Sequence, residues 1–151
     1  MATVNIAYGT TTAFTVAASL ASANYDLTGT VYNLTTTKPL DLELEYVATV
    51  AASSTGNKQI VLFLQVSLDG TNFSNPPLSV TDTTHDSSLI LLGTIPTNGG
   101  ASIETVRKTF SLANALGASL PAAVKLVVKN DTGVAMSSCS AQTRELTATV
   151  V

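Results

Sequence analysis

The most constraining feature of the sequence is the run Leu40-Asp41-Leu42-Glu43-Leu44-Glu45-Tyr46, in which apolar and mostly acidic residues alternate. A period of two places the apolar side chains on one face of a β-strand and the carboxylates on the other. On a helix the same leucines would be scattered around the axis. The alternation continues through Ala48 and Val50, and Pro39 marks its start. The run therefore predicts a strand with one buried and one wet face.

Further runs of this kind fill the rest of the chain and are separated by turn residues. In residues 58–68 the apolar positions share one face, while Val61 and Phe63 lie on the other, so the start of this strand is expected to be covered on both sides. Because a short turn cluster separates residues 40–50 from residues 58–68, these two strands are predicted to pair as a hairpin. Other strands are predicted in residues 88–95, 101–112, 124–128 and 146–150, with weaker ones in residues 4–8, 14–16 and 27–34.

About eight strands without a long helix predict an all-β fold, an antiparallel β-sandwich that is jelly-roll-like. The length of 151 residues fits one domain. Residues 1–25 are low in charge and in large side chains, so we expect an N-terminal arm or edge strand there. Residues 26–151 are then the single sandwich domain.

The composition argues for a surface that partners cover. Only 11% of the residues are charged and 45% are hydrophobic, whereas an average domain carries about 25% charged residues. The net charge of −3 and seven scattered basic residues argue against nucleic acid as a partner. No apolar run reaches the roughly 20 residues of a membrane helix, so no membrane partner is expected. The one cysteine, Cys139, excludes an internal disulfide, and no nearby residue in the sequence would activate its thiol.

A search for catalytic or metal-binding patterns finds only weak candidates. His85 is the one histidine, and it lies close in the sequence to Asp82 and Asp86. The group is interpreted as a solvated loop in preference to a weak metal site. Glu43 and Glu45 share a face of the predicted strand. They are interpreted as its wet side in preference to a pair of catalytic carboxylates. The oxygen-rich group Asp69, Asn72 and Asn75 lacks the EF-hand pattern, and a turn explains it without calcium. The prediction is a protein that is not an enzyme, with no catalytic, cofactor-binding or metal-binding residue and no cofactor.

A glycan-binding β-sandwich module, tail-associated or on a cell surface, is the alternative function. Such modules stack sugars on exposed aromatic rings, and the candidates here are Tyr25, Tyr32 and Phe73. The chain has no tryptophan, which counts against this alternative.

Three stretches together resemble small virion proteins of tailed bacteriophages. They are residues 64–73, which end in Ser67-Leu68-Asp69-Gly70-Thr71-Asn72-Phe73; residues 124–133, which end in Asn130-Asp131-Thr132-Gly133; and the segment from Tyr25-Asp26-Leu27 to Pro39-Leu40. The resemblance covers residues 25–151, and its motifs are turns and strands.

The resemblance implies a capsid decoration, or cement, protein. Such a protein is made in the host cytoplasm, binds the outer surface of the capsid and stabilises neighbouring capsomers through protein–protein contacts. The implied partners are the major capsid protein or other virion proteins, together with further copies of the chain, with a trimer favoured. The family has no catalytic residues to carry over. A tail location remains open on these residues.

Overall fold

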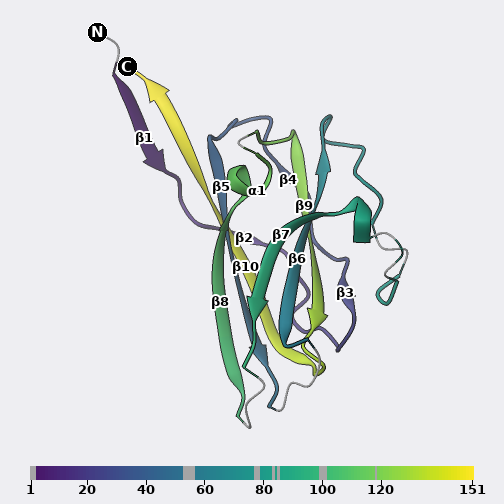
Figure 1. Cartoon of the computed structure of the whole chain (residues 1–151). Helices are drawn as coiled ribbons and strands as arrows, with labels where there is room; N and C mark the ends of the chain where they lie inside the picture. The colour runs from purple at the N-terminus through teal and green to yellow at the C-terminus, as the bar shows by residue number, and fades with distance from the viewer. Residues whose placement is uncertain are drawn as a thin grey trace.

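The computed structural model describes residues 3–52, 57–76, 79–82, 84, 86–98, 102–117 and 119–151. These residues form two antiparallel sheets packed face to face (Figure 1). The strands are β1 (Val4–Tyr8), β2 (Thr12–Phe14), β3 (Tyr25–Asp26), β4 (Tyr32–Asn33), β5 (Asp41–Val50), β6 (Gln59–Ser67), β7 (Ile90–Pro96), β8 (Glu104–Ser111), β9 (Ala123–Asp131) and β10 (Met136–Val150). One 3-10 turn (Asp86–Ser88) and one short helix, α1 (Leu112–Ala115), complete the list of described elements.

The order of the strands gives the sandwich a jelly-roll wiring. Sheet A has the order β1-β10-β5-β8, with β2 also paired to β10, and sheet B has the order β3-β9-β6-β7, with β4 also paired to β9. From β2 to β10 the chain crosses repeatedly between the sheets, and only β6 and β7 are consecutive strands that pair with each other. Repeated crossing of this kind is how a double-sheet jelly roll is connected. The predicted antiparallel, jelly-roll-like β-sandwich is therefore confirmed.

The predicted hairpin between residues 40–50 and 58–68 is wrong. β5 pairs with β10 and β8 in sheet A, whereas β6 pairs with β9 and β7 in sheet B. Alternation of apolar residues decides which face of a strand is buried, but it says nothing about which strand lies beside it. The two strands follow one another in the chain and face each other across the core.

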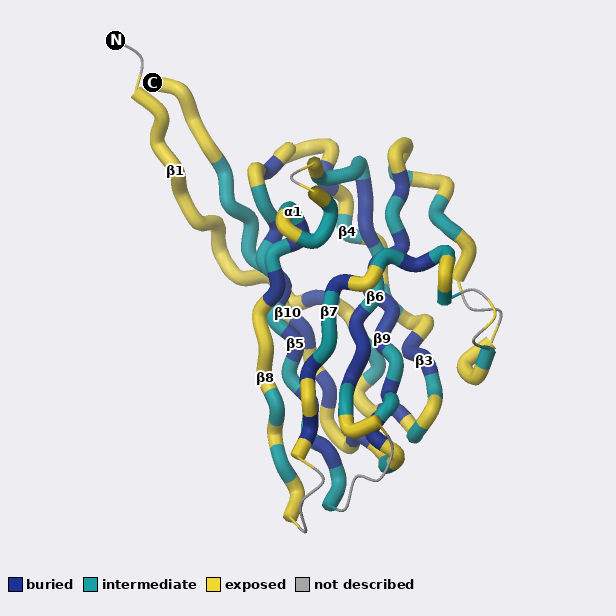
Figure 2. The backbone as a smooth tube through the Cα atoms, viewed as in Figure 1, coloured by how far each residue is buried: buried dark blue, intermediate teal, exposed yellow. Residues whose placement is uncertain are grey.

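The core lies between the two sheets, and β5 shows why it forms. Burial alternates without a break along all ten residues of β5. The inward side chains of β5 belong to one core cluster with those of β6 and β9. Figure 2 shows the buried residues of these strands as dark blue segments of the backbone. Burying one large apolar side chain contributes about 1.5–3 kcal/mol to the free energy of unfolding. The central inward residues are Leu42, Leu44, Tyr46, Ala48 and Val50 from β5, Ile60, Leu62 and Leu64 from β6, and Val124, Leu126 and Val128 from β9.

A second, smaller cluster covers part of sheet B from outside. Tyr25, Leu89 and Val127 are buried together, and Phe63 packs against them. Val61 is buried as well. The expectation that the start of β6 is covered on both sides is thus confirmed, because Val61 on the outer face and Ile60 and Leu62 on the inner face are all buried.

Residues 3–25 divide between two surroundings. β1 pairs with the far end of β10, away from the body of the sandwich (Figure 1). Phe14 and Leu20 belong to the main core, and Tyr25 belongs to the smaller cluster. The segment that the sequence suggests as an arm or edge strand therefore contributes the exposed strand β1, the short strand β2 paired with β10, and three buried side chains.

Gly29 offers a test of the packing around β9. A Cβ atom at Gly29 would lie 2.3 Å from the backbone oxygen of Leu126, a contact that only a backbone shift can relieve. We expect Gly29→Ala to lower the free energy of unfolding by about 1–3 kcal/mol. Gly9→Ala is the matched control, because its Cβ would meet nothing closer than 3.5 Å. Urea denaturation followed by circular dichroism measures both, and equal midpoints for the two variants would contradict this packing.

Candidate functional site

A two-stranded ribbon stands away from the sandwich (Figure 1). It consists of β1 and the last five residues of β10, paired from Tyr8 opposite Leu146 to Val4 opposite Val150. Two backbone hydrogen bonds of 2.9 and 2.8 Å between Thr3 and Val151 extend the pairing beyond the strands. The pairing partner of β10 on its other side, β5, stops at Asp41, which lies opposite Leu146. Beyond that point the ribbon has only its own two strands.

One face of the ribbon is entirely apolar. Residues directly opposite each other in an antiparallel pair point to the same side. One face therefore carries Val4, Ile6, Tyr8, Leu146, Ala148 and Val150, which we call the ribbon apolar face. The other face carries Asn5, Ala7, Thr147 and Thr149. Val4, Ile6, Tyr8 and Val150 are 58–70% exposed, so the apolar face is open to water.

Charged and aromatic contacts fix the base of the ribbon. The guanidinium of Arg144 lies 4.2 Å from the ring centre of Tyr8 and donates from Nε to Glu43 on β5 over 3.0 Å. On the opposite face of β10, the carboxylate of Glu145 accepts hydrogen bonds from Tyr32 (3.1 Å) and Thr37 (2.8 Å). Burial is the main cause that raises the pKa of the Tyr32 hydroxyl, and the hydroxyl therefore stays a donor. These contacts hold the direction in which the ribbon leaves the body.

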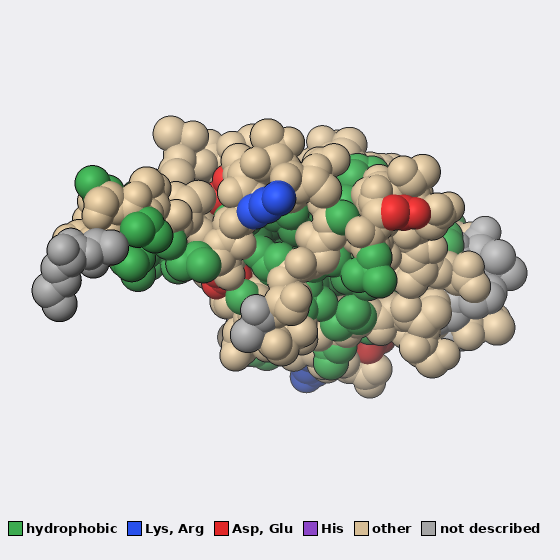
Figure 3. All heavy atoms as spheres, turned by 90° about the horizontal axis from the view of Figure 1, so that it is seen from above, with side chains coloured by type: hydrophobic (Ala, Val, Ile, Leu, Met, Phe, Trp, Pro, Cys, Tyr) green, Lys and Arg blue, Asp and Glu red, His purple; other side chains and the backbone are tan. Residues whose placement is uncertain are grey.

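A second apolar surface lies at the same end of the molecule, between the edges of the two sheets. It consists of two adjoining hollows of about 440 and 180 Å³ that share Leu120 and Pro121, and we call it the end groove. Its other apolar residues include Pro39, Leu40, Leu68 and Leu116. The side chains of Leu40 and Leu68 are among the exposed large hydrophobic residues. Figure 3 shows hydrophobic side chains both along the ribbon and over this end of the sandwich.

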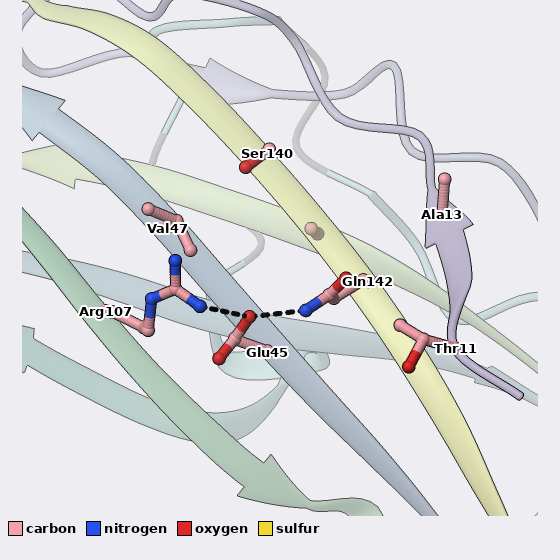
Figure 4. A pocket seen from close by; sticks show the side chains of 8 residues that line it. Thr11, Ala13, Glu45, Val47, Arg107, Ser140 and Gln142 are labelled. Atoms are coloured by element: carbon pink, nitrogen blue, oxygen red, sulfur yellow. Dashed lines mark hydrogen bonds and ion pairs between the residues drawn. The ribbon is translucent and has the colours of Figure 1, made fainter.

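The outer face of sheet A carries a polar cleft of about 410 Å³ (Figure 4). Glu45 projects into it and accepts hydrogen bonds from Arg107 (3.0 Å) and Gln142 (2.6 Å). Glu43, farther along the same face, is paired with Arg144. The interpretation of Glu43 and Glu45 as the wet face of a strand is confirmed, since both lie on the outer side of β5. Each carboxylate has its own cationic partner, so this face does not supply two free carboxylates for acid–base chemistry.

The remaining sequence candidates are not brought together into one site. His85 lies outside the described residues. Asp86 accepts a hydrogen bond from Tyr25 and pairs with Lys129 at 3.2 Å, and Asp82 accepts from Thr84. Among the described residues there is no group of three or more His, Cys, Asp or Glu side chains placed to hold a metal ion.

The oxygen-rich group around Asp69 is explained by its turn. The Asp69 carboxylate accepts from the backbone N–H groups of Asn72 and Thr71, both at 2.8 Å, and from the side chains of Asn72 and Ser67. These bonds, the one from the Asn72 backbone first, hold the pKa of Asp69 well below its usual range. The carboxylate is therefore engaged in closing the turn. The backbone oxygen of Asn75 accepts a hydrogen bond of 2.7 Å from the Ser88 hydroxyl.

Of the three aromatic candidates for a sugar platform, Phe73 alone is suitably placed. Tyr25 is buried, and the ring of Tyr32 stacks on Phe14 with 6.0 Å between centres. Phe73 lines a hollow of about 330 Å³, where the ammonium of Lys125 lies 4.6 Å from its ring centre. Ser74 lines the same hollow, and its buried hydroxyl oxygen has no hydrogen-bond partner among the described residues.

The sequence contained half of the signal for the ribbon. Alternation was visible at Val4, Ile6 and Tyr8 and again at Leu146, Ala148 and Val150. The pairing of these two segments, which are more than 130 residues apart, is what places all six side chains on one exposed face. The end groove gave no sequence signal, because its residues come from four separate segments.

Comparisons with known proteins do not establish a family. No family model and no curated protein matches the sequence. Among solved structures, a carbohydrate-binding module (CBM6cm-2) of Cellvibrio mixtus lichenase 5A, in complex with cellotriose, is 14% identical and has a TM-score of 0.35 over 91% of this chain and 88% of that one. The C-terminal CBM6 of the laminarinase LamC from Zobellia galactanivorans is 11% identical, also with a TM-score of 0.35, over 95% of this chain and 99% of that one.

Similarities this weak do not bear on what the chain binds. Neither of these two structures is a phage virion protein, and the resemblance to virion proteins stays a prediction. In the part of the chain that is described, no helix is long and apolar enough to cross a membrane. The class that the fold and its surface define is a jelly-roll sandwich with a projecting amphipathic ribbon.

Cys139 gives a test of how tightly β10 is held in the body. Its side chain is buried, and burial is the main cause that raises the pKa of the thiol, so little reactive thiolate exists at neutral pH. We expect the native protein at pH 7 to react with a maleimide at least about 100-fold more slowly than the same protein in urea. Mass spectrometry over time measures both rates. Similar rates in the two states would show that this part of β10 opens readily.

Proposed function

We propose that this chain is a non-catalytic structural protein that joins a protein assembly through its ribbon. The observation that carries the proposal is the ribbon apolar face, with six apolar side chains on a ribbon that stands away from the body. Contiguous exposed apolar surface of this kind marks an interaction site on soluble proteins. A two-stranded ribbon is also only marginally stable in water by itself, so a partner that covers one face stabilises it.

The chemistry of the ribbon favours a protein partner. Its apolar face offers no charged group and, apart from the Tyr8 hydroxyl, no polar side chain with which to recognise a sugar or a phosphate. Its backbone can also extend a neighbouring sheet, because β1 is paired on only one side within the described chain. The low charge of the whole chain fits a surface that partners cover.

The resemblance to tailed-phage virion proteins supplies the proposed setting. In that setting the chain is a decoration protein at the capsid surface, and its partners are the major capsid protein or other virion proteins, together with further copies of the chain. The two turn motifs that support the resemblance are structural here, since Asp69 closes one turn and Asn130 closes the other. They support a shared framework, and the ribbon supports attachment.

Attachment is tested with capsids of the phage that encodes the chain. Ile6→Glu places a charge at the centre of the ribbon apolar face, and burying that charge is costly. We expect co-sedimentation with the capsids to weaken at least 10-fold, which corresponds to about 1.4 kcal/mol. Ile103→Glu is the matched control, because Ile103 is a similarly exposed isoleucine, 69% against 64%, outside the ribbon and the end groove. Equal binding by all three proteins would reject the ribbon as the attachment site.

A glycan-binding module is the second candidate, and the hollow at Phe73 favours it. The half-buried ring of Phe73 and the Lys125 ammonium line this hollow and can contact the apolar face and the hydroxyls of one sugar ring. If the chain is a glycan-binding module, we expect binding to an array of bacterial surface glycans. Phe73→Ala should abolish this binding, and Tyr8→Ala should leave it intact. A protein that works through its ribbon alone gives no array signal, so the two candidates are distinguishable.

A further inference from the structure

Two apolar surfaces of this chain are exposed at the same end of the molecule and are complementary in form. The ribbon apolar face is convex, with side chains that stand out from two strands. The end groove is concave and is walled by Leu40, Leu68, Leu120 and Pro121. Six of the twelve exposed large hydrophobic residues of the described chain lie on the ribbon apolar face or in the end groove: Val4, Ile6, Tyr8, Leu40, Leu68 and Val150.

We propose that the ribbon apolar face of one copy docks into the end groove of a second copy. This inference rests on the proposed function, because it names the partner of the ribbon. Docking within one chain is not what the structure shows: the ribbon continues sheet A away from the body, and its apolar side chains remain open to water (Figures 1 and 2). The contacts of Arg144 and Glu145 at its base hold it in that direction.

Size and charge agree with this occupant. Five residues per strand give the ribbon a length of about 17 Å. The groove extends from Leu40 across Leu120 and Pro121 to Leu68, so it offers an elongated apolar surface rather than a single small pit. Among the described residues that line the groove, Lys38 is the one that is charged. The nearest charge on the ribbon side is Arg144 over the ring of Tyr8, and it is neutralised by its pairing with Glu43, so the aliphatic side chains of the ribbon bring no unpaired cation to Lys38.

The geometry of this contact sets the kind of oligomer. The ribbon and the groove are different surfaces, so the contact is head-to-tail, and each copy has one ribbon to give and one groove to fill. Such contacts close into a ring when the rotation between copies allows it and otherwise continue as a filament. A trimer, which the sequence resemblance favours, is the smallest such ring beyond a dimer.

The test uses two full-length variants that each spoil one side of the contact. The ribbon variant is Ile6→Glu, and the groove variant combines Leu40→Glu with Leu68→Glu; both leucines are more than half exposed, so neither change disturbs the core. Light scattering is measured on each variant, on the unchanged protein and on the Ile103→Glu control. We expect oligomers for the unchanged protein and the control, and single chains of 15.5 kDa for each variant alone.

Mixing the two variants is the decisive step. The intact ribbon of the groove variant can dock into the intact groove of the ribbon variant, so the equimolar mixture is expected to give a 1:1 dimer of twice the single-chain mass. A mixture that stays monomeric overturns the inference, because it still contains intact ribbons and intact grooves. Recovery of the dimer also distinguishes this contact from ribbon-to-ribbon pairing, which needs two intact ribbons and is not restored by mixing. Flotation of monomeric unchanged protein with phosphatidylcholine vesicles, lost in Ile6→Glu, would also overturn it in favour of a lipid surface.

The outcomes for the assembly and for the oligomer are separable. Unchanged protein that is monomeric in solution yet binds capsids through Ile6 would keep the proposed function and reject the second copy as the occupant. Oligomers restored by mixing, with no capsid binding, would keep the ribbon–groove contact and reject the virion setting.

Discussion

The pairing of β10 with β5 is the constraint on which the rest of the structure depends. Ten residues of β10 are paired with β5, and this pair forms the centre of sheet A. Because β5 begins at Asp41, the fifteen-residue β10 extends four residues beyond it, and β1 pairs with this extension. The ribbon is therefore an extension of a central strand, and the core that fixes β10 also fixes where the ribbon points.

The sequence predicts the faces of strands well and their neighbours poorly. Alternation from Leu40 to Val50 places every inward side chain of β5 correctly, because burial of one face is a local property of the strand. The partner of β5 is not local: it is set by how the whole chain crosses between the sheets, which is why the hairpin prediction fails. The same limit hid the ribbon, whose two halves are each visible in the sequence while their pairing is not.

The candidate site residues show this division as well. Glu43 and Glu45 are recognisable as a wet face, yet the arginines that neutralise them come from β10 and β8 and become neighbours only through strand register. Asp69 and Asn130 are different, because each closes a turn with groups two or three residues away, and such turns are written in the sequence. Motifs of that kind report a framework, and unrelated sandwiches can share them.

The balance between the polar cleft and the ribbon follows from what each would lose on binding. In the cleft, Glu45 is already hydrogen-bonded to Arg107 and Gln142, so a ligand that replaces either of them gains less binding free energy, by the hydrogen bond that it breaks. The ribbon apolar face has no such internal partners among its aliphatic side chains, and covering it returns about 25 cal/mol for each Å² of apolar surface removed from water. Binding at the ribbon apolar face thus breaks fewer internal contacts than binding in the cleft, and this face is also exposed to water. The search for a partner of this chain therefore begins at the ribbon.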